Sequence, residues 1–344
     1  MFTDRKEKIK VALANGAQFD AVPIRGKRTI GEGMDSHEIS FILAHQPVTV
    51  VNKENPLTEL IFPILSFPSV LSSQSKRISD GKTIFRVPDI RIEVSGWCIE
   101  ITGVDNIRDV EMILRQKRGL GITYTGKVTQ LNKTEFEVNE AKKLLRALQI
   151  FLSFSCGRAC GFPLVEGKDR RGLNSWVRWG SHYIHSWNYQ HSLLLLYHFD
   201  KILQGLFSKF LALYKNDEWA KVLIRAIYYY LESNNVPMRE VGIISTQITL
   251  ELLSSQILRE LGQSKKKREA AGIFINRAFE ALNIAPHIPE HCECLRNVRN
   301  IHHWENGLHA LTDIRNDIVH SNGKFDDSPN LQIEAWPLLL WHME

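Results

Sequence analysis

Hydrophobic and polar residues alternate over roughly residues 39–131, or the hydrophobic ones gather in short β-branched runs. A period of two is typical of strands that bury one face. Turn-forming Pro, Gly and Asn residues separate these runs. We therefore predict a β-rich N-terminal domain, interrupted by one helix at residues 106–118, where apolar residues repeat at helical spacing. The predicted strand segments are 38–44, 48–51, 90–96, 97–104 and 121–131.

The pattern changes near residue 133, where apolar residues begin to repeat every three or four positions. Thr134 is predicted to cap this helix, because Glu137 follows three residues later as in a capping box. A Gly-rich and Trp-rich stretch at 156–180 then predicts a hairpin or extended loop packed by Trp176 and Trp179. We expect a domain junction in this part of the chain.

From residue 191 onward the apolar spacing is helical almost throughout, with breaks at 234–237, 262–264 and 322–324. Such a run of amphipathic segments with short connections is typical of a helical bundle. The predicted fold class is therefore α+β, with a β-rich N-terminal domain followed by an all-α C-terminal bundle. The predicted units are a β-rich sensing or regulatory domain at 1–135, a helical and Trp-rich connecting region at 136–235, and a helical domain at 236–344.

Composition places the chain among globular proteins, since its 344 residues are 44% hydrophobic and 24% charged. The net charge of +5 favours acidic partners such as nucleic acid. Five cysteines, an odd number, indicate reduced thiols, and we expect a cytoplasmic protein. No apolar run has the length of a membrane span, and the first ten residues do not resemble a secretory signal, so no membrane partner is expected.

Two enzyme classes lack their sequence signals in this chain. No Gly-rich loop followed by Lys-Ser or Lys-Thr is found, which argues against NTPase or kinase chemistry. No Gly-x-Ser-x-Gly segment is found either, which argues against an α/β-hydrolase.

The candidate chemistry lies in a predicted helix near the C-terminus, where polar residues border an apolar stripe. The stripe faces the bundle. Asn316 and His320 are four residues apart and share a neighbouring face, and Arg315 borders the other edge of the stripe. We therefore expect a guanidinium, an amide and an imidazole along one polar groove. The apolar stripe consists of Leu308, Leu311, Ile314 and Ile318.

These three side chains suit RNA cleavage without a metal. The reaction needs a base for the 2′-hydroxyl, an acid for the leaving 5′-oxygen and a cation for the crowded phosphate. His320 can exchange protons near neutral pH, Arg315 can hold phosphate oxygens, and Asn316 can orient the imidazole or the phosphate. One histidine cannot be acid and base at once, so we predict a homodimer that shares the site across the motif helix. No metal or other cofactor is required.

The hexapeptide from Arg315 to His320 resembles the Arg-Asn-x-x-x-His motif of HEPN domains. The predicted order of helices over residues 237–344 is also similar to that superfamily, particularly to its ApeA-like abortive-infection branch. The resemblance implies a HEPN-like helical domain that acts as a metal-independent endoribonuclease, with Arg315 and His320 as catalytic residues and Asn316 assisting. It further implies 2′,3′-cyclic phosphate products, a toxin or anti-phage role, and a phage-derived trigger or antitoxin as a possible partner.

Alternative interpretations stay open for each of these features. Arg315 and His320 can simply solvate a helix end, where cations interact well with the helix dipole. A HEPN-type fold can also bind nucleic acid or protein without cleaving. The basic run Lys265, Lys266, Lys267 and Arg268 is predicted to contact RNA phosphates, although such runs are often solvated turns.

Histidines and cysteines crowd together at residues 287–303, just before the motif helix. Zinc prefers such ligands, but the spacing is not that of a standard zinc site, so we predict no metal. Cys156 and Cys160, four residues apart at a helix end, are expected to pack rather than react.

Overall fold

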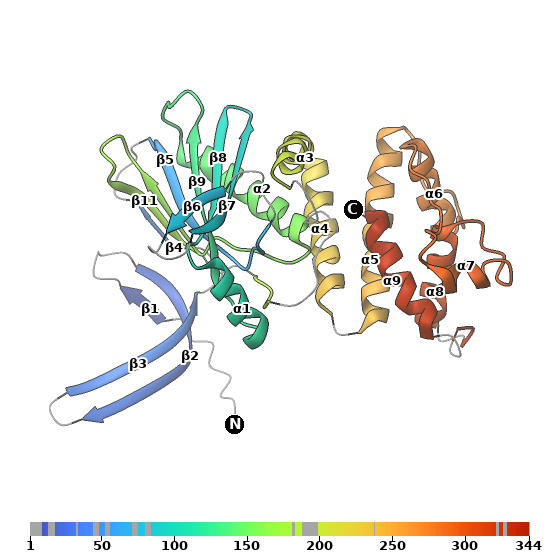
Figure 1. Cartoon of the computed structure of the whole chain (residues 1–344), viewed down its shortest axis with the longest axis horizontal. Coiled ribbons are helices and arrows are strands. Elements are labelled where there is room, and N and C mark those ends of the chain that lie inside the picture. Colours follow the sequence, from blue (N-terminus) through green and yellow to red (C-terminus); the bar gives the residue numbers. More distant parts are fainter. Residues whose placement is uncertain are drawn as a thin grey trace.

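Strands fill the N-terminal half of the chain and helices fill the C-terminal half (Figure 1), which confirms the α+β class. The computed structural model describes residues 9–12, 18–31, 34–43, 48–51, 56–70, 75–79, 84–180, 183–187, 199–236, 238–320, 323–325 and 329–343. The strands are β1 (Ile9–Ala12), β2 (Gln18–Gly31), β3 (Met34–Leu43), β4 (Val48–Val51), β5 (Glu59–Leu65), β6 (Ser75–Ser79), β7 (Ile84–Val94), β8 (Trp97–Gly103), β9 (Ile122–Gln130), β10 (Leu164–Lys168) and β11 (Asn174–Trp179). The helices are α1 (Ile107–Lys117), α2 (Val138–Cys156), α3 (Phe199–Tyr214), α4 (Asp217–Asn235), α5 (Arg239–Glu260), α6 (Ala271–Ala281), α7 (Glu293–Val298), α8 (Gly307–His320) and α9 (Pro329–Met343).

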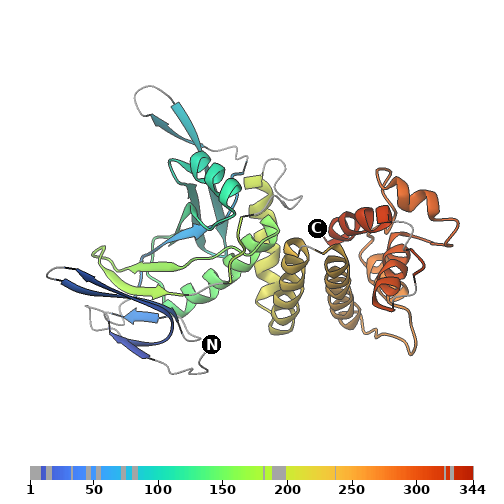
Figure 2. The same ribbon diagram turned by 90° about the horizontal axis from the view of Figure 1, so that it is seen from below.

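The main sheet has eight strands in the order β4-β11-β10-β5-β9-β8-β7-β6, and neighbouring strands are antiparallel. A separate three-stranded sheet, β1-β2-β3, extends beside it (Figure 2). The predicted strands at 48–51, 90–96, 97–104 and 121–131 correspond to β4, β7, β8 and β9. The helix predicted at 106–118 is α1.

Close packing in the centre of the sheet depends on Gly126 of β9. Its cross-strand partner is Phe62 of β5, a fully buried residue. A Cβ atom at Gly126 would lie only 2.2 Å from the Phe62 ring, so glycine at this position leaves the space that the ring occupies. Pro63, the next residue of β5, lies beyond the end of the β10 pairing at Ile61, so its missing N–H removes no hydrogen bond on that side.

Helix α2 covers one face of the sheet and joins its hydrophobic core (Figure 1). The prediction that Thr134 caps this helix is wrong. The N-cap is Glu137, which forms a capping box with Glu140, and the helix starts at Val138. Thr134 instead donates its hydroxyl proton to Oδ1 of Asn132 at 2.7 Å, within the preceding turn.

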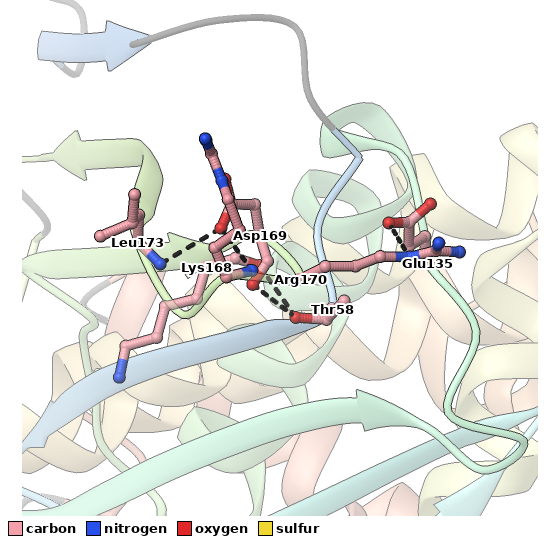
Figure 3. A network of polar contacts seen from close by, with 7 residues as sticks. Thr58, Glu135, Lys168, Asp169, Arg170 and Leu173 are labelled. Carbon is pink, nitrogen blue, oxygen red and sulfur yellow. Dashed lines mark hydrogen bonds and ion pairs between the residues drawn. The ribbon is translucent and has the colours of Figure 1, made fainter.

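The hairpin β10–β11 confirms the element predicted at 156–180, and its turn is held by intrachain polar contacts (Figure 3). The Arg171 guanidinium, at 2.8 Å, and backbone amides hold the pKa of the Asp169 carboxyl down to about 2. Arg170 pairs with Glu135 at 2.5 Å. These two arginines therefore stabilise the turn. Trp176 is fully buried, whereas Trp179 is 46% exposed.

Two large hydrophobic cores, and a small cluster of Leu258, Phe274 and Ala278, are found among the described residues. The first runs from Leu57 to Leu231 and joins the main sheet to α2, α3 and α4, so a boundary at 135/136 falls inside one core. The second runs from Ile243 to Leu339 and is built from helices and from residues of the segments between them, such as Trp304 and Phe325. Helices α4 and α5 pack side by side where the two cores meet (Figure 1). Among the described residues, only α5 has the length and apolar composition of a membrane span, and half of its most apolar window is buried within the protein.

Candidate active site

The predicted motif lies on the C-terminal half of α8. Asn306 caps this helix, because its Oδ1 accepts the N–H of His309 at 3.0 Å. The predicted apolar stripe faces the second core: Leu308, Leu311 and Ile314 are buried, and Ile318 is partly buried. The polar residues of the motif are thereby left at the edges of the buried face.

Arg315 and Asn316 are joined directly. Nη1 of Arg315 donates to Oδ1 of Asn316 at 3.0 Å, although the two residues lie about 100° apart around the helix. Nε of Arg315 is buried without a hydrogen-bond partner. His320 is the last residue of α8 and is exposed. It lies one turn beyond Asn316 on the same face, and about 140° around the axis from Arg315.

A polar cleft of about 220 Å³ lies between α6 and α8. Of the three predicted site residues, Asn316 lines this cleft, whereas Arg315 and His320 are not among its lining residues. The α8 wall continues from Asn316 through Asp313 and Thr312 to His309. One copy of the chain therefore joins Arg315 to Asn316, which lines the cleft, and leaves His320 outside the lining at the end of α8.

His309 belongs to this wall and was not among the predicted site residues. It is exposed, and its Nδ1 accepts the N–H of Glu305 at 3.4 Å, so Nε2 is the nitrogen left for other contacts. His309 precedes Asn316 by seven residues, which is two helical turns. That spacing was the signal in the sequence that placed both residues on one face.

Helices α6 and α8 approach closely and run in opposite directions. Gly272 of α6 lies against Thr312, where a Cβ atom would be 3.0 Å from the Thr312 hydroxyl oxygen. One turn further along α6, Asn276 Oδ1 accepts a hydrogen bond from Asn306 Nδ2 at 3.2 Å. The N-terminal end of α6 therefore lies beside the C-terminal half of α8, which carries the motif.

This arrangement brings the basic run toward the motif end of α8. Residues 265–268 immediately precede α6, and Ala270, its N-cap, lines the same cleft as Asn316. The N-cap makes no side-chain hydrogen bond to the first turn of α6. Lys265 pairs with Glu251 at 3.5 Å, while Lys266, Lys267 and Arg268 are exposed. The cations flank the cleft but do not line it.

Two aspartates of α8 fix the structure around the motif. Asp317 is buried and accepts the backbone N–H groups of Lys324 at 2.8 Å and Phe325 at 3.1 Å. Asp313 accepts from Trp304 Nε1 at 2.9 Å and from Lys324 Nζ at 2.5 Å. Burial alone would raise the pKa of Asp313, but these hydrogen bonds hold it below its ordinary value.

The histidines and cysteines at 287–303 are held by packing and capping. His302 stacks on Trp304 with ring centroids 5.0 Å apart. Glu334 of α9 accepts the N–H groups of Cys294 at 3.0 Å and Leu295 at 2.9 Å, which caps α7. Within the described ranges, no three His, Cys, Asp or Glu side chains are grouped as metal ligands would be. Cys156 and Cys160 are fully buried, with Sγ atoms 3.1 Å apart.

Two segments of the chain match known protein domains. Residues 52–190 match the YopA central domain, and residues 216–344 match the YopA C-terminal domain. The chain is similar to YopA in both parts. The SPbeta prophage-derived uncharacterized protein YopA of Bacillus subtilis (strain 168) is 24% identical over 327 residues, which are 92% of this chain and 71% of that protein. No solved structure matches significantly.

The matched segments follow the two cores of the structure only in part, because α3 lies outside both matches and α4 of the first core lies in the C-terminal match. The YopA central-domain match contains β5 to β11 with α1 and α2, and the C-terminal match contains α4 to α9. The motif helix and its cleft therefore lie entirely within the segment similar to the YopA C-terminal domain. Neither the names of the matched domains nor that of the Bacillus protein states an activity. The resemblance to HEPN domains therefore stays a prediction.

Proposed function

We propose that the chain is a metal-independent endoribonuclease of the HEPN type, with Arg315, Asn316 and His320 as its catalytic residues. The observation that supports it most is the hydrogen bond from Arg315 to Asn316 at the rim of a polar cleft, which presents a permanent cation beside an amide. The exposed imidazole of His320 one turn away supplies a group that exchanges protons near neutral pH.

RNA is a suitable ligand for this cleft because positively charged groups flank the cleft and attract phosphates. Lys266, Lys267 and Arg268 flank the N-terminal end of α6, whose first-turn N–H groups carry a partial positive charge. Phosphates interact favourably with both features. The buried Nε of Arg315 is a donor that an entering phosphate oxygen would satisfy after a small side-chain rotation.

A second copy of the chain would complete the proton transfers. Cleavage to a 2′,3′-cyclic phosphate needs both an acid and a base, and a homodimer that pairs two motif helices would supply two copies of His320.

A toxin or anti-phage role, with a phage-derived trigger or antitoxin, rests on the resemblance to the ApeA-like branch. Five free cysteines support a cytoplasmic setting for this activity.

The test is cleavage of a labelled RNA in EDTA by the full chain and by His320→Ala. We expect the intact chain to cleave and the variant to lose activity by about 10²-fold or more while it still folds. His291→Ala, which removes an exposed histidine outside the cleft, is the matched control and should cleave normally. Retained cleavage in His320→Ala would contradict the proposal. Retained RNA binding without any cleavage by the intact chain would instead support a non-catalytic binding module.

A further inference from the structure

A second cavity, of about 270 Å³, lies between α2 and α4 and opens to the surface at the edge of the first core, away from the motif helix. Arg146, Gln149 and Ser153 line it from successive turns of α2, so they share one face of that helix. The wall from α4 is largely apolar. Gln149 is fixed in place, because its Nε2 donates to the carbonyl oxygen of Cys160 at 3.2 Å.

Two tyrosine rings form the aromatic part of this cavity. Tyr228 projects from α4, and Tyr183 lies in the segment that follows β11. Their ring centroids are 6.5 Å apart with an interplanar angle of 46°, and the residues are 51% and 61% exposed. Exposed tyrosine faces beside a polar wall are suited to stack on a planar heterocycle.

Two arginines belong to this part of the structure, and Arg146 is the one that lines the cavity. Arg146 lines it from α2, and Arg178 of β11 pairs across the sheet with the fully buried Val165, which places the Arg178 side chain on the face that α2 covers. Nε of Arg178 is buried without a partner. Neither guanidinium forms an ion pair with a residue that the structure describes. Burial first, and then repulsion from Arg146, lower the pKa of Arg178.

A partly buried cation such as Arg178 is unfavourable beside a like charge unless an anion joins the two. Arginine forks match phosphate oxygens with two parallel hydrogen bonds, which lysine cannot provide. Arg146 and Arg178 therefore supply the charge and the donor groups that a phosphate needs, and Arg146 lines a cavity with aromatic walls.

We propose that this cavity binds a single nucleotide, with the phosphate between Arg146 and Arg178 and the base against Tyr183 or Tyr228. A volume of about 270 Å³ lies just below the usual range for small-molecule sites, which begins at about 300 Å³, so the cavity suits a mononucleotide rather than a polymer. Arg146, Arg178 and Tyr183 lie in the segment similar to the YopA central domain, and Tyr228 lies in the segment similar to the C-terminal domain. The site is apart from the proposed cleavage site, and it gives the first core a ligand to sense.

Isothermal titration calorimetry of the full chain with AMP, GMP and UMP tests the proposal, with adenosine and inorganic phosphate as partial ligands. At least one monophosphate should bind, and adenosine and phosphate should each bind at least about tenfold more weakly. Arg146→Gln and Tyr228→Leu should each weaken nucleotide binding by about tenfold. Arg108→Gln, an exposed arginine on α1, is the control and should bind as the unmodified chain does.

Both substituted side chains lie at the surface, so neither substitution should unfold the protein. Arg146 and Tyr228 are both exposed, and a near-ultraviolet circular dichroism spectrum checks each variant. No heat with any monophosphate at millimolar concentration would overturn the proposal. Equal affinities for inorganic phosphate and the nucleotides would also overturn it, because the tyrosines would then contribute nothing. Binding unchanged in Arg146→Gln would do the same.

Discussion

Arg315 donates Nη1–H to Oδ1 of its neighbour Asn316 at 3.0 Å, and this contact joins the guanidinium to a residue that lines the cleft. Its planar fork can hold the amide and a phosphate oxygen together, whereas a lysine ammonium could not keep that geometry. Arg315→Ala should therefore lower kcat/KM for RNA by an amount equivalent to about 2 to 4 kcal/mol. Arg315→Lys should recover only part of this loss. Single-turnover cleavage rates of the two variants measure this difference. Full activity in Arg315→Lys would contradict a role for the planar guanidinium.

Asp317 is predicted to be a structural residue of the motif. Its buried carboxylate accepts two backbone N–H groups of the segment after α8, so Asp317→Asn should destabilise the fold by about 1 to 3 kcal/mol. Chemical denaturation measures the free energy of unfolding. Asp105→Asn, at an exposed aspartate, is the control and should change that free energy little. Equal values for the two variants would show that the carboxylate does not hold this segment.

Gly272 is predicted to set the distance between α6 and α8. A Cβ atom there would lie 3.0 Å from the Thr312 hydroxyl oxygen and 3.2 Å from the Leu308 carbonyl oxygen. Gly272→Ala should therefore lower the free energy of unfolding by about 1 to 2 kcal/mol, despite the better helix propensity of alanine. Gly205→Ala on α3 has open space around its Cβ and should stabilise by about 0.5 to 1 kcal/mol. Thermal or chemical unfolding that ranks the two variants the other way would contradict this packing.

His342 is predicted to make stability depend on pH. Burial, with a contribution from His287, lowers the pKa of His342 from 6.5 to about 4, so the folded protein keeps it neutral where the unfolded chain takes up a proton. The free energy of unfolding should therefore fall as pH decreases from about 6.5 to about 4. His342→Gln should flatten that part of the profile. Urea titrations at pH 7 and pH 4.5 measure it, and an identical slope in the variant would exclude His342 as the cause.

Local patterns predicted the elements well and the long-range pairings poorly. The helix at 106–118 and the stripe of Leu308, Leu311 and Ile314 follow from spacing alone, because one face must be buried. Nothing local indicated that β10 would pair with β5, about a hundred residues earlier, and so join the first core. Several residues near a helix start can serve as its N-cap, so the sequence did not show that Glu137, with Glu140, caps α2 in place of Thr134.

Only the part of the candidate site that lies within the single helix α8 could be predicted from the sequence. The positions of Asn316 and His320 followed from their four-residue spacing, and His309 could have been added by extending the same stripe. The cleft could not be predicted, because it depends on the antiparallel packing of α6 against α8 at Gly272. That packing also brings the basic run before α6 toward the motif, although the two segments are about fifty residues apart in sequence.

Analysis of the ends that the full chain produces from a labelled RNA in EDTA tests the central claim most directly. An acid–base site without a metal should yield 2′,3′-cyclic phosphate and 5′-hydroxyl ends at a rate that EDTA leaves unchanged, and His320→Ala prepared identically should yield neither. Ends with a 5′-phosphate, cleavage only when Mg²⁺ is added, or no cleavage at all would contradict the assignment of Arg315, Asn316 and His320 as an RNA-cleaving site.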